Sequence, residues 1–298
     1  MVPILSVHNI SKKYGTIQAL NNVSFNVPPG SVFGILGPNG SGKTTLLGIL
    51  LDILKPQTGS FSWFGREGAS ESRKQIGSLL ETPNFYHYLS AGDNLKITQA
   101  ISGRGRLTDI DKILETVNLL QRKNSKFSSY SLGMKQRLAI GAALLGSPKI
   151  LVLDEPTNGL DPVGIAEIRR IIKALATTGV TIIMASHMLD EVEKICTHVA
   201  ILKKGNLLIA GAVDEVLTNE DIVELSAPNI EYLINVLDGF SGYTSKKIEG
   251  NRVQLFFPIN TLQLEDLNRY CFEKGITLNH LSIKRKSLET KFLELTNN

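Results

Sequence analysis

A glycine-rich stretch near residue 40 has the residue types and spacing needed to hold phosphate groups. It reads Gly37-Pro38-Asn39-Gly40-Ser41-Gly42-Lys43-Thr44, which is the P-loop pattern G-x-x-x-x-G-K-[ST]. Apolar runs over 31–36 and 44–54 predict a buried strand before the loop and a helix after it. Such a turn points several backbone N–H groups at one place, where the helix dipole adds positive potential. The stretch therefore predicts a binding site for a nucleotide's phosphates.

Two side chains of this loop are suited to the outer phosphates. Lys43 is expected to reach the β- and γ-phosphates, and the Thr44 hydroxyl to ligate Mg²⁺.

A second group of chemical side chains follows an apolar run over 150–153. The run ends in Asp154 and Glu155, which predicts a buried parallel strand with two acids at its carboxyl end, where ligands bind in open α/β sheets. Asp154 is expected to hold the Mg²⁺ that Thr44 holds from the other side. Glu155 is expected on the opposite face of the strand, where it can orient and deprotonate a water molecule.

Two further residues are candidates for the same site. His187 follows a third apolar strand, over 180–184, and this strand end is expected to face the phosphates, which favours a catalytic role over a structural one. Tyr14 lies in a predicted turn about two dozen residues before the P-loop. It can stack on adenine or be a half-buried turn residue, and the sequence leaves both open.

Length and composition limit the class of protein. The chain has 298 residues, 42% hydrophobic and 20% charged, which predicts a globular fold with one large and one smaller domain. A net charge of +4 is too small to predict a nucleic-acid partner. No run approaches the ~18 apolar residues of a membrane span, and the N-terminus does not resemble a signal peptide. The two cysteines are far apart and are expected to be buried free thiols.

The elements that must position these residues predict an α/β fold. Residues 1–220 are expected to form a nucleotide-binding domain with a mixed sheet, an antiparallel subdomain over 4–27 and a helical insertion over about 82–145. From residue 221 the order strand, helix, strand, strand, helix, strand predicts a small ferredoxin-like α+β domain over 221–298, with a last helix over 287–295. Residues 65–73 are expected to be a polar loop.

Taken together, these stretches resemble the ATP-binding subunits of ABC transporters over residues 3 to about 220. The resemblance rests on motifs in the family's order and spacing: Tyr14, the P-loop, Ser131 to Gln136, the 150–155 strand, Gly159-Leu160-Asp161 and His187. It implies that Tyr14 stacks on adenine. It also implies that the residues from Gly37 through Thr45 bind the phosphates. It also implies that Asp154 binds Mg²⁺, that Glu155 is the general base, and that His187 contacts the γ-phosphate.

The resemblance also implies that two copies are needed. Ser131 and Gly133 match the signature motif, which in this family touches the γ-phosphate bound by the other subunit of a dimer. Asp161 lies in the loop that links the two sites. ATP is therefore expected to be sandwiched between two ATPase subunits, in a homodimer that separates after hydrolysis.

Two residues depart from the family pattern. Leu132 stands where the signature motif usually has a glycine, and Glu81 stands where a glutamine usually touches Mg²⁺ and relays to the membrane subunit. A carboxylate at position 81 either strengthens metal binding or disfavours ATP before Mg²⁺ is present.

Three features resemble the exporter branch near bacitracin and lantibiotic resistance transporters. They are the sequence from Tyr130 to Arg137, Glu81 and the C-terminal stretch 287–296. This implies a peripheral ATPase on the cytoplasmic face of the cell membrane that drives a separate permease, with an antimicrobial peptide or another amphipathic compound as cargo. The alternative is a soluble ABC ATPase acting on ribosomes or DNA. Such proteins usually carry two ATPase halves or a long coiled coil, and this chain has one P-loop and no sustained heptads.

Four rings crowd together at Phe85-Tyr86-His87-Tyr88, just past Glu81. They are either core filler at the root of the helical insertion or a contact surface for a partner helix. Family members receive the permease's coupling helix at this point, which favours the contact surface. A role of the C-terminal domain as a ligand sensor is a further hypothesis.

Overall fold

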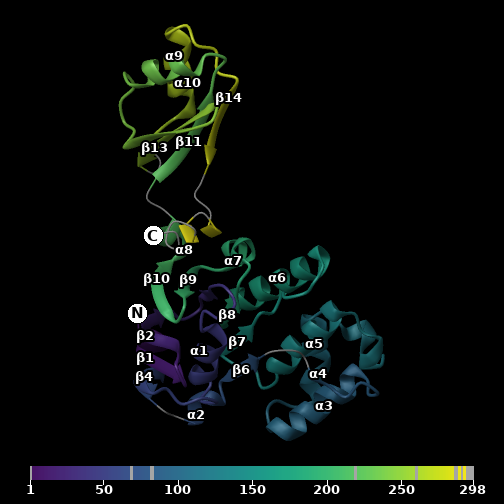
Figure 1. The fold of residues 1–298 in the computed structure, drawn as a ribbon. Helices are drawn as coiled ribbons and strands as arrows, with labels where there is room; N and C mark the ends of the chain where they lie inside the picture. Colours follow the sequence, from purple (N-terminus) through teal and green to yellow (C-terminus); the bar gives the residue numbers. More distant parts are fainter. Residues whose placement is uncertain are drawn as a thin grey trace. The chain divides into compact units, whose positions relative to one another are not determined.

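The computed structural model describes residues 2–67, 70–80, 84–217, 220–258, 261–284, 288–289 and 291–292. These fall into two compact units, Met1–Val213 and Asp214–Asn298 (Figure 1). The division lies a few residues before the boundary between 220 and 221 that the sequence predicts. Within the described ranges, no helix combines the length and the apolarity that crossing a membrane requires.

A six-stranded sheet forms the centre of the first unit, in the order β10-β9-β3-β8-β7-β6. The pairs from β9 to β6 are parallel, and β10 is antiparallel to β9. Every residue of β3, β7 and β8 is buried, as their unbroken apolar runs predict. The strands span Val32–Leu36 (β3), Ile76–Leu79 (β6), Ile150–Asp154 (β7), Thr181–Ser186 (β8), His198–Lys203 (β9) and Asn206–Ala212 (β10).

Three helices follow strands of this sheet directly (Figure 1). They are α1 (Lys43–Leu50) after β3, α6 (Pro162–Thr177) after β7 and α7 (Leu189–Ile195) after β8. The start of α6 is set by sequence: the Asp161 side chain accepts a hydrogen bond from the Gly164 N–H at 2.8 Å, and Pro162 occupies the first helical position. The ends of β3, β7 and β8 therefore lead into tight turns at one edge of the sheet.

A second, antiparallel sheet has the order β2-β1-β4-β5. Its strands are β1 (Leu5–Tyr14), β2 (Ile17–Val27), β4 (Thr58–Trp63) and β5 (Arg66–Glu67), and α2 (Ser70–Arg73) follows. The predicted polar loop over 65–73 was wrong, because Phe64 and Gly65 both have positive φ and close a tight hairpin that pairs β5 with β4.

Helices fill the chain between β6 and β7. They are α3 (Ala91–Ser102), α4 (Ile110–Thr116) and α5 (Leu132–Ala143), with short 3-10 turns over Leu107–Asp109, Leu120–Arg122 and Phe127–Ser129. Serine caps two of them: Ser90 accepts from the Asp93 N–H of α3, and Ser131 accepts from the Met134 N–H of α5. The helical insertion that the sequence predicts is present.

The second unit has its own sheet and its own core. After α8 (Val213–Leu217) come β11 (Glu220–Ser226), α9 (Ile230–Leu237), β12 (Ser245–Glu249), β13 (Arg252–Pro258), α10 (Leu264–Glu273) and β14 (His280–Lys284). The sheet order β12-β13-β11-β14, with every pair antiparallel, is that of a ferredoxin-like domain, so the predicted α+β fold is confirmed. The predicted helix over 287–295 lies largely outside the described residues.

Both cysteines are buried and free, as expected. Burial raises the pKa of the Cys196 and Cys271 thiols, which makes both poor nucleophiles.

Candidate active site

The glycine-rich loop joins β3 to α1, and neighbouring backbone fixes its shape. Gly42 has φ 105°, and a Cβ there would lie 2.4 Å from the carbonyl oxygen of Ala19 in β2. A Cβ on Gly37 would lie 2.3 Å from the carbonyl oxygen of Leu202 in β9. Only glycine fits at either position, because a strand from each sheet presses against the loop.

Lys43 is buried in this loop. Its Nζ donates to the carbonyl oxygens of Gly37 at 2.8 Å and Pro38 at 3.3 Å, and it lies 3.4 Å from Glu155 Oε1. The ammonium group therefore stands between the loop's backbone and the carboxyl end of β7.

Ser41 supplies a buried hydroxyl to the same loop. Its side chain is 1% exposed, and its Oγ has no hydrogen-bond partner among the described residues. A buried hydroxyl without a partner costs about 1–3 kcal/mol. A phosphate oxygen is an acceptor of the right chemistry for this hydroxyl and for the backbone N–H groups at the start of α1.

A pair of oxygen atoms lies beside the lysine. The Thr44 hydroxyl donates to Asp154 Oδ2 at 2.9 Å, and Asp154 is buried at the end of β7. Hydroxyl and carboxylate oxygens suit a hard divalent cation. No group of three or more His, Cys, Asp or Glu side chains in the described part of the chain is placed to hold a metal ion. A cation here would take its other ligands from phosphate oxygens and water.

Glu155 connects this cluster to β8. Its Oε2 lies 2.8 Å from His187 Nδ1, while its other oxygen faces Lys43. The Glu155 backbone has φ 48°, the left-handed region, and its N–H donates to the Ala185 carbonyl of β8 at 3.0 Å. This conformation costs a non-glycine residue about 1–2 kcal/mol.

The cluster combines an anion site with a proton acceptor. A half-buried carboxylate held between an ammonium group and an imidazole can accept a proton from a water molecule beside a phosphate. The positive φ of Glu155 could not be predicted, because no residue type next to it in the sequence indicates a left-handed backbone at this position.

Other predicted site residues lie elsewhere in the fold. Tyr14 ends β1 and is 47% exposed, with Lys12 Nζ 5.5 Å from its ring centroid. Within the described ranges, no ring contact or hydrogen bond joins Tyr14 to the glycine-rich loop. Glu81 lies outside the described residues.

Ser131 and Gly133 line a separate groove of about 460 Å³ between the start of α5 and residues 159–164, which lead into the first turn of α6. No hydrogen bond or ion pair in the described ranges joins Ser131 or Gly133 to Lys43 or Glu155. A Cβ on Gly133 would lie 3.8 Å from Gly164 Cα and 3.9 Å from Leu160 Cδ2, which are ordinary van der Waals contacts. Leu132 is 48% exposed at the mouth of the groove, and its Cδ2 would lie 3.4 Å from a Cβ on Gly159.

The four-ring stretch divides into two faces. Phe85 and His87 pack edge-on against the buried ring of Phe127, at centroid distances of 5.2 and 5.5 Å. Tyr86 and Tyr88 contact each other at 6.0 Å and are 48% and 69% exposed. Sequence reasoning did not single out Phe127, because a lone phenylalanine between polar residues carries no periodic signal.

Comparisons with known proteins agree with this geometry. The family model for the ABC transporter matches residues 20–158. The bacitracin transport ATP-binding protein BcrA of Bacillus licheniformis is 35% identical, over 99% of this chain and 98% of that protein. The lantibiotic transport ATP-binding protein SrtF of Streptococcus pyogenes is 41% identical, over 71% of this chain and 92% of that protein.

A solved structure of similar fold shows two copies together. It is the dimeric, post-hydrolysis ATP-binding cassette MJ0796 bound to ADP and Pi, which is 26% identical with a TM-score of 0.63. The similarity covers 70% of this chain and 99% of that one.

Proposed function

Because this chain belongs to the ABC transporter family of ATP-binding, ATP-hydrolysing subunits, we propose that it drives a separate permease that exports an antimicrobial peptide or another amphipathic compound. The observation that supports the catalytic half of this proposal is the position of Glu155. Its carboxylate lies 3.4 Å from Lys43 and 2.8 Å from His187, beside a loop built for phosphate.

Each residue of the cluster has a proposed part in hydrolysis. Lys43, Ser41 and the loop N–H groups bind the phosphates, and Thr44 and Asp154 would hold Mg²⁺, which neutralises phosphate charge. Glu155 accepts a proton from the attacking water, and His187 holds the Glu155 carboxylate in place. Tyr14, exposed at the end of β1, is proposed to stack on adenine.

The second copy completes the site in this proposal. The groove of Ser131 and Gly133 is separate from the Lys43 cluster in the same chain. A similar cassette is dimeric with ADP and Pi bound. We therefore propose a homodimer in which Ser131 and Gly133 of one chain face the γ-phosphate held by Lys43 of the other.

The relatives support the proposed cargo and location. Bacitracin and lantibiotic transport proteins match this chain at 35% and 41% identity. The chain would therefore work as a peripheral subunit on the cytoplasmic face of the cell membrane. The alternative, a soluble ABC ATPase without a transport partner, has no observation in its favour.

The export function is tested by producing the chain in a sensitive bacterium together with a candidate multi-span permease from the same genome. The inhibitory concentration of bacitracin or of a lantibiotic is expected to rise severalfold with the natural chain and not with Glu155→Gln, because transport needs hydrolysis. An equal concentration with both chains, for both compounds, would exclude these cargos while leaving the ATPase activity to be measured separately.

Tyr86 and Tyr88 are proposed to contact the permease, since both are exposed and their rings contact each other, whereas the rings of Phe85 and His87 contact Phe127. Changing both tyrosines to alanine is expected to reduce permease recovered by affinity purification at least about tenfold, because aromatic anchors dominate interfaces. Binding of ATP is expected to be unchanged.

The matched control changes Ile101 and Leu107 to alanine, since both are exposed apolar residues of the same helical region. Full recovery of permease with the double tyrosine variant would remove these rings from the interface.

A further inference from the structure

The outer face of α10 carries a stripe of solvent-facing side chains. Glu265, Asn268, Arg269 and Phe272 are spaced at i, i+3, i+4 and i+7, which places them on one side of the helix, while Leu267 and Cys271 are buried on the other. We refer to these four residues as the α10 stripe. Phe272 is 73% exposed, although a ring of this size normally lies in a core.

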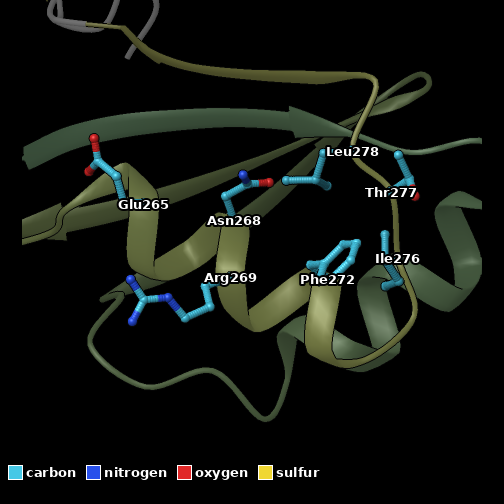
Figure 2. A pocket seen from close by; sticks show the side chains of 7 residues that line it. All are labelled: Glu265, Asn268, Arg269, Phe272, Ile276, Thr277 and Leu278. Atoms are coloured by element: carbon cyan, nitrogen blue, oxygen red, sulfur yellow. The ribbon is translucent and has the colours of Figure 1, made fainter.

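A groove of about 520 Å³ runs between the α10 stripe and residues 276–278. Figure 2 shows Phe272 beside Ile276 at one end, and Glu265 and Arg269 at the other. Ile276 is buried and belongs to the core of the second unit. The groove therefore combines an apolar end with two opposite charges one helical turn apart.

Glu265 and Arg269 are not paired with each other. Their i,i+4 spacing would permit an ion pair within the helix. No ion pair or hydrogen bond to either residue occurs within the described ranges, and in Figure 2 the two side chains point apart. Both charges remain available to a binding partner.

We propose that the α10 stripe binds the same stripe of a second copy of this chain, with the two helices antiparallel about a two-fold axis. In such an interface residue i faces residue j, and j faces i. A two-fold axis at the level of Leu267, on the opposite side of the helix from its buried side chain, places Glu265 opposite the partner's Arg269, and Arg269 opposite the partner's Glu265. Phe272 then lies opposite the segment that precedes the partner's α10, which contains the half-buried Leu262.

Charge complementarity is what favours a second copy over a different protein. The α10 stripe carries both members of the ion pair at the spacing that two-fold symmetry needs, so it is its own complement. A partner of another sequence would have to supply the opposite order of charges. The contact needs no nucleotide, so it is independent of the proposed ATP-dependent dimer.

The strength of the contact is limited by its size. A helix of 10 residues is about 15 Å long, and a pair of such helices buries less than the roughly 1,200 Å² of a stable interface. The dissociation constant is therefore expected between about 1 µM and 1 mM.

Sedimentation equilibrium of the full chain, freed of nucleotide and kept in EDTA, tests the contact at concentrations up to roughly 1 mM. A reversible monomer–dimer equilibrium is expected. Glu265→Arg and Arg269→Glu are each expected to weaken it at least about tenfold, because each places like charges opposite one another. The double variant, which exchanges the charges, is expected to recover the natural affinity.

Phe272→Ser is expected to weaken the dimer as well. The control for Glu265→Arg is Glu231→Arg on α9, which makes the same change of charge outside the α10 stripe and is expected to leave the dimer unchanged. Every changed side chain is solvent-facing, so circular dichroism and ATPase rate are expected to match the natural chain. A natural chain that stays monomeric throughout the range overturns the proposal. So does a double variant that stays as weak as the single ones.

Discussion

Replacing Glu155 by glutamine is expected to stop ATP turnover while ATP binding is retained. The amide has nearly the shape of the carboxylate and stays beside Lys43 and His187, so the phosphate site keeps its geometry. The amide cannot accept a proton from water, and loss of a general base costs about 10²–10⁴ in rate. Because hydrolysis is what separates the two copies in the proposed mechanism, the variant is expected to accumulate as an ATP-bound dimer.

Phosphate release measures the turnover, and gel filtration with light scattering in ATP and Mg²⁺ measures the dimer. Glu115→Gln, an exposed glutamate of α4, is the matched control and is expected to behave as the natural chain. A Glu155→Gln chain that stays monomeric and releases phosphate at the natural rate would exclude Glu155 as the general base.

Replacing Lys43 by methionine is expected to weaken ATP binding at least about a hundredfold without unfolding the protein. The ammonium group is the one buried cation that the described residues place in the loop, and its loss removes the charge that faces the phosphates. Methionine fills a similar volume. The melting temperature without nucleotide is expected to fall, because removal of the ammonium group takes a partner from the Glu155 carboxylate and from the Gly37 carbonyl while the protein stays folded.

Titration with a fluorescent ATP analogue measures the affinity, and a thermal melt without nucleotide measures stability. Lys173→Met, an exposed lysine of α6, is the control for a general loss of charge. Natural affinity in Lys43→Met would mean that backbone N–H groups alone hold the phosphates.

The elements around the site could be predicted from the sequence because each is encoded locally. The run over 150–153 is apolar at every position, and β7 is buried throughout. Asp161-Pro162 combines a capping side chain with a residue that fits the first turn, and α6 begins there. The apolar runs on either side of the P-loop predict a strand and a helix, and both are present as β3 and α1.

Features that depend on distant backbone could not be predicted. The left-handed conformation of Glu155 is held by a hydrogen bond to the Ala185 carbonyl, 30 residues away in sequence. The exclusion of any side chain at Gly42 comes from Ala19, on a strand of the other sheet. The division of the four rings into two faces comes from Phe127, which lies beyond α3 and α4.

The separate core of the second unit has a consequence for inheritance. Val223, Leu255 and Phe257 pack with one another and with the inner sides of α9 and α10, in a cluster distinct from that around β3. Each unit thus meets by itself the requirement for burying its apolar side chains. A chain without the second segment is therefore expected to fold, so that selection could add or discard the second unit without rebuilding the catalytic one.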